Sequence, residues 1–310
     1  MPQNKKITLK DRVITSLGHN EPDVMPYSIS MTKGAHDKMA EFYNDPDFMK
    51  GLDRYLVSAG VASRLPDKWF TEQTFDDCEI FMQDSNERYD WLAKFAEENK
   101  DSFIIIAGTS YFETAWGLYG MQNLMADMAG NEKFVYKIMD RIHEHYLNMI
   151  GQIVKFDIDC VHINDDYGMQ TGLIMGPVCW RKFFKPYLKE AVAKIKSGGK
   201  YAQLHSCGDL REIMPDLVEI GFDILNPFQP EAMDVYEIKK EFGKYITFSG
   251  GVSEQKVMAQ GTPDDVERET KEKMKLLGKN GGYIVGPSQA ITDDVPAESI
   301  DRFIKIVTNQ

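Results

Sequence analysis

The side chains that most directly suggest chemistry in this sequence are a histidine and a cysteine separated by one residue, His205 and Cys207. Imidazole nitrogen and thiolate sulfur are both zinc ligands, and where a strand gives way to a loop, residues i and i+2 can turn toward one ion. A catalytic zinc takes about three protein ligands and keeps one position open, so two ligands are too few. The tripeptide is also compatible with a structural histidine and a buried free cysteine beside the turn residue Gly208.

Two adjacent carboxylates and a phenol, Asp165, Asp166 and Tyr167, form the second candidate group. A carboxylate that faces a substrate can position it, act as an acid or base, or bind a metal ion. We therefore predict that these three residues are catalytic. Either aspartate could instead cap a helix or stabilise a turn.

Further polar residues follow other predicted strands and are candidates for substrate binding. Glu113 could contact substrate or simply be a carboxylate of the first helical turn, where the helix dipole favours it. Glycines let a backbone approach a ligand closely, but they also serve tight turns. The candidate substrate-binding residues are Glu113, Asn226, Gln229, Gly250, Gly251 and Gln289.

The elements that position these residues alternate along the chain. Short β-branched or aromatic runs are followed by turn residues and then by longer amphipathic stretches, a pattern typical of βα units around a parallel sheet. The predicted strands are Met25–Ser30, Cys78–Met82, Phe103–Ala107, Asp157–Ile163, Lys200–His205, Phe222–Asn226, Tyr245–Ser249 and Gly282–Val285. The second has the weakest strand signal.

Helices are expected between these strands. The clearest patterns cover Asn131–Phe156, Val178–Lys196 and Pro296–Val307, and Thr262-Pro263 opens another helix with Thr262 as its N-cap. The segment Asn131–Phe156 is rich in charged residues, so His143 and His145 within it are expected to face solvent.

Eight strands alternating with helices predict an α/β fold, a (β/α)8 TIM barrel formed as a single domain over residues 1–310 with a short N-terminal extension. An open doubly wound sheet is the alternative, but no G-x-G-x-x-G follows a predicted strand. In such barrels the active site lies at the carboxyl ends of the strands, and the candidate residues above follow strands.

Composition narrows the class of protein. Hydrophobic residues make up 43% of the 310-residue chain, which is enough for a core. A formal net charge of −12 argues against a general affinity for nucleic acid or anionic membranes. No apolar run approaches the roughly 18 residues that a membrane helix needs, and no signal peptide is visible. The four cysteines are scattered, without the spacing typical of disulfide pairs. A cytoplasmic location is therefore expected.

Together these features resemble the uroporphyrinogen decarboxylase superfamily, most closely its branch of corrinoid-dependent (cobalamin) methyltransferases. The resemblance covers the C-terminal half from about residue 155 in order and spacing, and the N-terminal half mainly at its start. The stretches that carry it are Asn20–Pro26, Asp165–Gly168, Trp180–Tyr187, His205–Gly208, Asp223–Pro227, Ser249–Gly251 and Gly281–Ile284.

The resemblance implies a methyltransferase that works with a corrinoid protein as its partner. Methyltransferases of this family hold zinc with a His-x-Cys after strand five, which His205 and Cys207 match, and with a cysteine after strand eight. That third position falls at Gln289, a poor zinc ligand. Either Asp165, Asp166 or Glu113 supplies the third ligand, or zinc is weak or absent. The implied function is methyl transfer between a small substrate, such as a methoxylated aromatic or a thiol, and the corrinoid protein.

Two other functions stay open at this stage. A metal-free decarboxylase of the porphyrin pathway would use Asp165 or Asp166, but the family's decarboxylases bind their highly anionic substrate through arginines after the first strand. The corresponding loop, Tyr27–Gly34, contains Lys33 and no arginine. A non-catalytic binding protein on the same barrel is the third possibility, supported by Gln289. The sequence does not identify the methyl donor or acceptor, or the oligomeric state.

Overall fold

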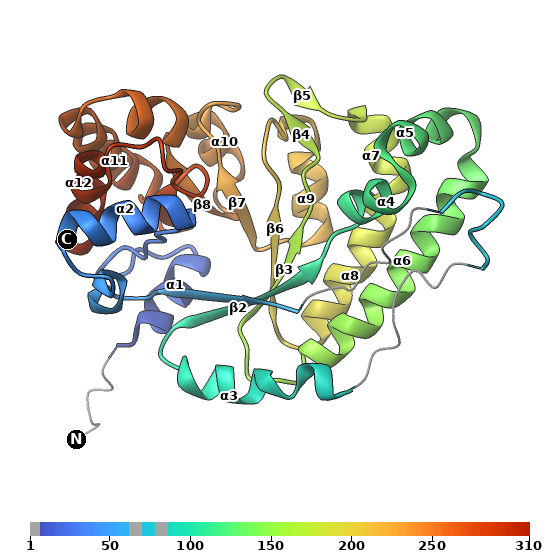
Figure 1. Cartoon of the computed structure of the whole chain (residues 1–310), viewed down its shortest axis with the longest axis horizontal. Coiled ribbons are helices and arrows are strands. Elements are labelled where there is room, and N and C mark those ends of the chain that lie inside the picture. The colour runs from blue at the N-terminus through green and yellow to red at the C-terminus, as the bar shows by residue number, and fades with distance from the viewer. Residues whose placement is uncertain (1–6, 62–69, 78–85) are drawn as a thin grey trace. The chain divides into compact units, whose positions relative to one another are not determined.

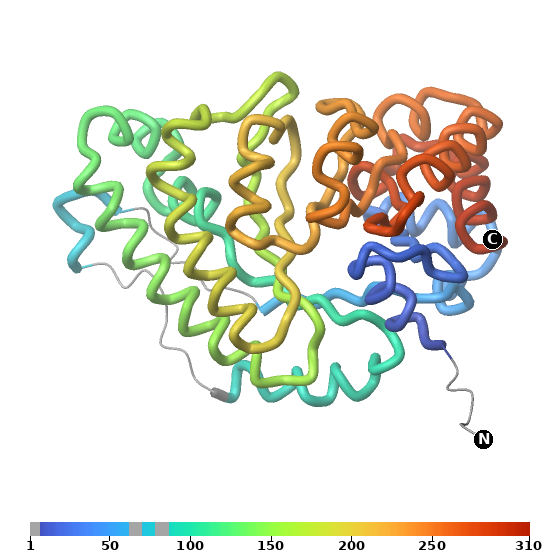
Figure 2. The backbone as a smooth tube through the Cα atoms, turned by 180° about the vertical axis from the view of Figure 1, so that it is seen from behind, coloured from blue at the N-terminus to red at the C-terminus, as the bar shows by residue number. Residues whose placement is uncertain are grey.

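The computed structural model describes residues 7–61, 70–77 and 86–310. The chain divides into two compact units, one of residues 1–57, 100–103 and 224–310 and the other of residues 58–99 and 104–223. Strand β1 (Leu56–Gly60) passes from the first unit into the second at Ser58, and β2 (Phe103–Thr109) does so at Ile104. Figure 1 and Figure 2 show the elements of each unit from opposite sides. The single domain expected over 1–310 stays a prediction.

The second unit holds a parallel sheet in which β3 (Cys160–Asn164) lies between β2 and β6 (Tyr201–His205). Val161 is in register with Ile106 on one side and with Ala202 on the other. Parallel strands buried on both faces carry continuous apolar runs, which Phe103–Ile106 illustrates. An antiparallel pair, β4 (Gly168–Met169) and β5 (Gly172–Leu173), follows β3 directly.

Helices cover this sheet. The long α6 (Glu132–Ile153) and α8 (Lys185–Ser197) run side by side, with α9 (Met214–Ile220) next to α8 (Figure 2). Residues spaced three or four apart on α6, including Phe134, Ile138 and Ile142, are buried, as an amphipathic helix requires. The other elements of the unit are η2 (Asn86–Tyr89), α3 (Trp91–Glu98), α4 (Phe112–Tyr119), α5 (Met121–Gly130), α7 (Gly176–Phe183) and η3 (Arg211–Ile213).

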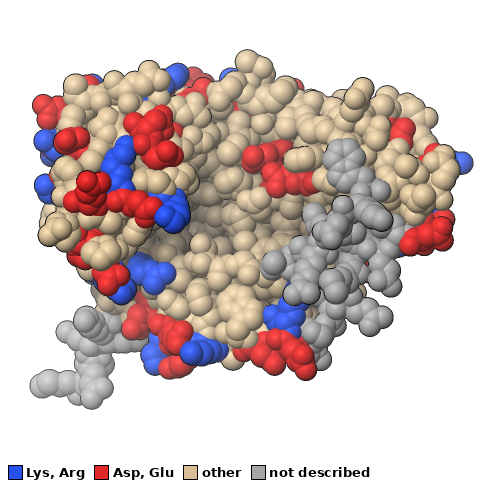
Figure 3. Space-filling model, in the orientation of Figure 1, with Lys and Arg blue, Asp and Glu red and all other residues tan. Residues whose placement is uncertain are grey.

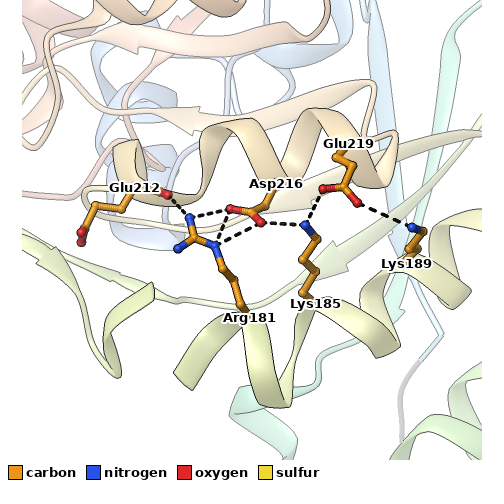
Figure 4. Close-up of polar contacts among 6 residues, drawn as sticks. All are labelled: Arg181, Lys185, Lys189, Glu212, Asp216 and Glu219. Carbon is orange, nitrogen blue, oxygen red and sulfur yellow. Dashed lines mark hydrogen bonds and ion pairs between the residues drawn. The ribbon is translucent and has the colours of Figure 1, made fainter. Parts of the chain in front are cut away.

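An ion-pair network ties α7 and α8 to α9 (Figure 4). The Arg181 guanidinium donates to both carboxylate oxygens of Asp216, at 2.8–3.2 Å, and the Lys185 ammonium donates to Asp216 at 2.7 Å. Lys185 also pairs with Glu219. Because Asp216 is buried, its two cationic partners compensate for the loss of its hydration.

The first unit holds the parallel strands β7 (Ile224–Phe228), β8 (Thr247–Val252) and β9 (Tyr283–Pro287) in that order. Every residue of β8 and β9 is buried. Helix α10 (Val235–Phe242) connects β7 to β8, and α11 (Pro263–Leu277) connects β8 to β9. Helix α12 (Ala297–Thr308) packs beside α11. The remaining elements of the unit are α1 (Leu9–Leu17), α2 (Lys33–Tyr43), η1 (Phe48–Gly51) and the π-helical turn η4 (Glu254–Met258).

Most expected elements are confirmed with shifts of a few residues at their ends. The start of α11 is as predicted, because Thr262 caps it by accepting from the Asp265 backbone N–H while the Asp265 carboxylate accepts from Thr262. On the face in Figure 3, charges of both signs are interspersed over the first unit, and that part of the face shows no continuous basic surface.

Several predictions were wrong. The segment Met25–Ser30 is not a strand: it has one isolated bridge, from Tyr27 to Val285 of β9, since Pro26 has no N–H to donate to a ladder. The helix expected over Val178–Lys196 is two helices, because Phe184 leaves the helical conformation just before Pro186. The strand expected at Cys78–Met82 lies outside the described residues, and β1 was not predicted.

The prediction that His143 faces solvent was also wrong, since its side chain is buried and only 8% exposed. Its Nδ1 lies 2.9 Å from the Tyr111 hydroxyl and its Nε2 lies 3.0 Å from the Glu190 carboxylate.

In the part of the chain that the structure describes, no helix is long and apolar enough to span a membrane.

Candidate metal and substrate site

The second unit brings the candidate metal ligands together at the ends of β3 and β6. Asp166 Oδ1 lies 3.7 Å from His205 Nε2, and Cys207 Sγ lies 3.8 Å from the same nitrogen. One ligand atom from each of these three residues lies within 4.8 Å of the other two. The sequence predicted His205 and Cys207 as metal ligands and left Asp166 as one of three candidates for the third.

The loops after β3 and β6 can meet because glycines stand where they touch. A Cβ at Gly168 would lie 2.5 Å from the Cys207 carbonyl oxygen, and a Cβ at Gly208 would lie 2.3 Å from the Gly168 carbonyl carbon. Gly208 also has a φ of +87°, which L residues rarely adopt. The contact is held by the Cys207 backbone N–H, which donates to Asp166 Oδ1 at 2.8 Å.

The geometry of this trio fits a divalent metal with mixed ligands. With zinc bond lengths of about 2.0–2.3 Å, tetrahedral geometry places neighbouring N and O ligands about 3.4 Å apart and N and S ligands about 3.6 Å apart. The observed separations of 3.7 and 3.8 Å lie within about 0.3 Å of these values. Imidazole, thiolate and carboxylate together with an open position form the donor set of a catalytic rather than a closed structural zinc site.

Burial, and then the Asp166 charge, raise the pKa of the Cys207 thiol to about 12. The thiol is therefore protonated at neutral pH while no cation is near, and a metal ion that binds must displace that proton. No positively charged side chain contributes to this shift. A cation at the centre of the trio would supply the missing positive charge.

Asp165 is fully buried and serves a different purpose from its neighbour. Its carboxylate accepts from the backbone N–H groups of Tyr111, Phe112 and Glu113 at 2.8–2.9 Å, all at the start of α4. The Tyr167 hydroxyl donates to it at 2.5 Å. Burial raises the pKa of Asp165, while these hydrogen bonds oppose the change. The aspartate caps α4 and orients the loop that carries Glu113, so its predicted catalytic role and that of Tyr167 stay untested predictions.

Glu113 lines a cavity of about 570 Å³ in the second unit. Burial first, and then the charges of Asp165 and Asp166, together raise its pKa to about 7. Its Oε2 accepts from Asn164 Nδ2 at 3.2 Å and more weakly from Ser110. The carboxyl group can therefore hold or release a proton near neutral pH, close enough to the metal ligands to feel their charge.

The rest of the described cavity wall is mostly apolar or small. It is formed by Gly60, Val61, Ala107, Gly108, Thr109, Ser110, Thr114, Trp116, Gly117, Tyr146 and Asn164. The sequence analysis named none of these as site residues. Ser110 and Asn164 could have been found, because Ser110 directly follows β2 and Asn164 is the last residue of β3. Tyr146 could not, because it comes from the middle of α6.

The remaining predicted substrate-binding residues belong to the first unit. Gly250 and Gly251 have φ values of +121° and +98°, and a Cβ at Gly251 would lie 2.7 Å from the Tyr283 hydroxyl. Tyr283 donates from that hydroxyl to the Gly250 carbonyl at 2.7 Å. These contacts account for both glycines without a ligand, and their role in substrate binding stays a prediction.

The polar members of this set have partners inside the unit. The Gln289 amide donates to Glu254 Oε2 at 2.8 Å, and Glu254 also accepts from Thr292. The Asn226 amide donates to the Ser249 carbonyl oxygen and contacts its hydroxyl, both at 3.5 Å, while Gln229 is buried. Asn226, Gln229 and Gln289 therefore also stay predictions as substrate-binding residues.

Comparison with known proteins places these features in a family. Residues 58–310 match the model described as uroporphyrinogen decarboxylase (URO-D). Over 132 residues the chain is 26% identical to a curated protein, "Methylcobamide:CoM methyltransferase MtaA" of Methanosarcina barkeri. That alignment covers 42% of this chain and 36% of the relative, so the chain matches about a third of the relative's length.

The fold has a closer counterpart among solved structures. A methyltransferase from Methanosarcina mazei superimposes with a TM-score of 0.70 over 98% of this chain and 99% of that one, at 17% sequence identity. The α/β, TIM-barrel-like fold expected from the alternating elements is confirmed by this likeness and by the family match. At that identity the likeness establishes the fold alone.

Proposed function

This chain belongs to the uroporphyrinogen decarboxylase family, and we propose that it is a metal-dependent methyltransferase acting between a small substrate and a corrinoid protein. The observation that carries the proposal is the convergence of Asp166, His205 and Cys207 on one point. The distant similarity to a methylcobamide methyltransferase supports the reaction class. The corrinoid would be carried by a separate partner protein, as the sequence resemblance implies.

We propose that Asp166, His205 and Cys207 hold zinc. In this proposal the Asp166 carboxylate takes the place of the family's third ligand, a cysteine whose position is occupied by Gln289 in this chain. When bound, zinc would supply a Lewis acid that polarises a substrate heteroatom or lowers the pKa of a substrate thiol. His205 and Cys207 alone would be too few ligands, so the assignment depends on Asp166.

Glu113 is the residue that we propose to move the proton. A thiol acceptor must lose its S–H proton, which the Glu113 carboxylate can take as it becomes a carboxylic acid. An ether donor gains a proton on its departing oxygen, which the Glu113 carboxylic acid can give. A carboxyl with a pKa of about 7 is suited to both directions near neutral pH.

The neighbouring residues keep this carboxyl in place. Asp165 holds the first turn of α4 through three backbone N–H groups, so the backbone that carries Glu113 is fixed relative to the end of β3. Asn164 and Ser110 both donate to Oε2 of Glu113, which leaves Oε1 for a ligand. The mostly apolar wall around it lowers the local polarity at the carboxyl group.

The experiment is metal analysis combined with a methyl-transfer assay. Protein purified anaerobically should contain about one zinc per chain, since one three-ligand site is present. Cys207→Ala should lose metal and turnover together. Cys179→Ala is the control, because Cys179 lies on α7 outside the trio. A wild-type protein that stays free of metal after zinc is supplied, or a fully active Cys207→Ala variant, contradicts the proposal.

A further inference from the structure

A second cavity, of about 660 Å³, lies in the first unit and has a strongly basic wall. It is formed where the end of α10, the end of α11 and the segment before β9 come together. Four lysines line it, Lys239, Lys240, Lys244 and Lys279. We call this the lysine cavity. It has no residue in common with the metal site described above, and the inference does not depend on the proposed function.

The lysines of this cavity lack the carboxylate partners that other lysines of the same unit have. Lys271 pairs with Glu267 at 2.5 Å and Lys305 pairs with Asp301 at 2.7 Å. Among the described residues, no ion pair joins any of the four cavity lysines to an acidic side chain, and the described wall contains no carboxylate. Two carboxylates lie next to the wall, since Glu272 accepts from Tyr236 and Glu21 accepts from Asn280, but neither of these described residues forms an ion pair with a cavity lysine. In a chain with a net charge of −12, this is a local concentration of positive charge.

Lys239 is the member that the fold holds in place. Its ammonium group donates to the carbonyl oxygens of Gly281 and Gly282, both at 2.7 Å. An ammonium has three N–H donors, so one remains for a ligand. Burial lowers the pKa of Lys239 to about 8, with no neighbouring carboxylate to offset the loss of hydration. An anion bound here would supply that missing interaction.

The remaining wall offers apolar surface to the same ligand. Leu276 is 49% exposed at the end of α11, and Leu277 and the Tyr236 ring also line the cavity. A cavity of this volume is in the range that holds an organic molecule rather than a single inorganic ion. Charge at one side and apolar surface at the other favour a ligand with an anionic group and an apolar body.

We propose that the lysine cavity binds a small phosphorylated organic molecule, with its phosphate on the lysines and its apolar part against Leu276, Leu277 and Tyr236. Lys239, already fixed by two carbonyl groups, would donate its remaining N–H to a phosphate oxygen. Lys240 and Lys244 would add screened charge from the rim, so binding should weaken as salt is added.

Pyridoxal 5′-phosphate is a suitable probe, because it combines a phosphate, an aromatic ring and an aldehyde that reports which lysine it meets. The lysine nitrogen attacks the aldehyde carbon and water leaves, forming an imine. Borohydride then adds hydride to the imine carbon and fixes the label as a secondary amine. Peptide mass spectrometry of the full chain identifies the labelled lysines.

The expected result is saturable labelling concentrated on the cavity lysines and suppressed by inorganic pyrophosphate. The control is Lys275, an exposed lysine on α11 that does not line the cavity. Lys275 should be labelled no more than other surface lysines are. Pyrophosphate should not change its labelling. Labelling that follows exposure alone, with Lys275 modified as readily as the cavity lysines, overturns the proposal.

Binding without covalent chemistry gives a second, independent readout. Pyridoxine 5′-phosphate, which has no aldehyde, should bind in calorimetry, and pyridoxine should not. Lys239→Met should weaken binding by about tenfold, the effect expected from one charge-assisted hydrogen bond, while Lys275→Met should leave it unchanged. Lys244→Met, on the exposed rim, tests the site if Lys239→Met folds poorly. Equal binding of pyridoxine 5′-phosphate and pyridoxine would also overturn the proposal. So would unchanged binding in both Lys239→Met and Lys244→Met.

Discussion

The backbone N–H of Cys207 donates a 2.8 Å hydrogen bond to the Asp166 carboxylate, and this contact brings two strand ends of the second unit together. Asp166 follows β3 and Cys207 follows β6, and these are adjacent parallel strands. The same carboxylate oxygen lies 3.7 Å from His205. One hydrogen bond therefore positions the third candidate ligand beside the other two.

Replacing Asp166 by asparagine should weaken zinc binding. The amide oxygen keeps the shape of the side chain but removes the negative charge, so we expect the dissociation constant to rise by about 10–100-fold or more. Competition with a chromophoric chelator measures the change. Asp157→Asn is the control, because Asp157 is exposed just before β3. If Asp166→Asn binds zinc as tightly as wild type, the third ligand lies elsewhere.

Asp165 should be important for stability. Its buried carboxylate accepts three backbone N–H bonds and one from the Tyr167 hydroxyl, and an asparagine would turn its NH2 group toward some of these donors. We expect Asp165→Asn to lower the free energy of unfolding by about 2–4 kcal/mol. Urea unfolding of metal-free protein tests this. A change as small as that of Asp157→Asn would contradict the capping role.

Glu113 should make stability depend on pH. Its pKa is raised from 4.5 in the unfolded chain to about 7 in the folded protein. Between these values the folded state binds more protons, so stability falls as pH rises from about 4.5 to 7. Because the side chain is partly exposed, solvent screening reduces the full effect to about 1 kcal/mol.

Glu113→Gln should remove this decrease of stability with rising pH. The variant should therefore be more stable than wild type above pH 7 and should match it near pH 4. Unfolding midpoints of metal-free protein at several pH values provide the measurement. A difference between the two proteins that stays constant with pH would show that the Glu113 pKa is not raised.

Asp216 should contribute far more to stability than its exposed neighbour Glu219, although both pair with Lys185 (Figure 4). The Asp216 side chain is 8% exposed and that of Glu219 is 55% exposed. We expect about 2–3 kcal/mol from Asp216→Ala, which also strips Arg181 of its partner, and less than about 1 kcal/mol from Glu219→Ala. Thermal unfolding of the two variants tests the contrast, and equal losses would refute it.

The fold could largely be predicted from periodicity, because each parallel strand is a short apolar run and each connecting helix has its own buried face. Local exceptions were harder to see. The break at Phe184 depends on Pro186 two residues later, within a pattern that is otherwise continuous. The burial of His143 depends on Tyr111 and Glu190, which come from other elements.

The candidate site was predictable only in part. His205 and Cys207 stand out because their residue types and spacing suit a metal on their own. Asp165 and Asp166 have the same side chain at adjacent positions, and no local pattern distinguishes a helix cap from a ligand. Their hydrogen bonds separate them, since one carboxylate faces the start of α4 and the other faces the Cys207 backbone.

The sequence by itself determined the class of fold and the donor pair His205 and Cys207, because hydrophobic periodicity and side-chain chemistry are local properties. The tertiary structure decided which aspartate joins that pair, which carboxyl has its pKa raised by burial, and which lysines gather without carboxylates. Those outcomes depend on distances between residues far apart in the chain. Folding sets these distances through packing, and no local spacing encodes them.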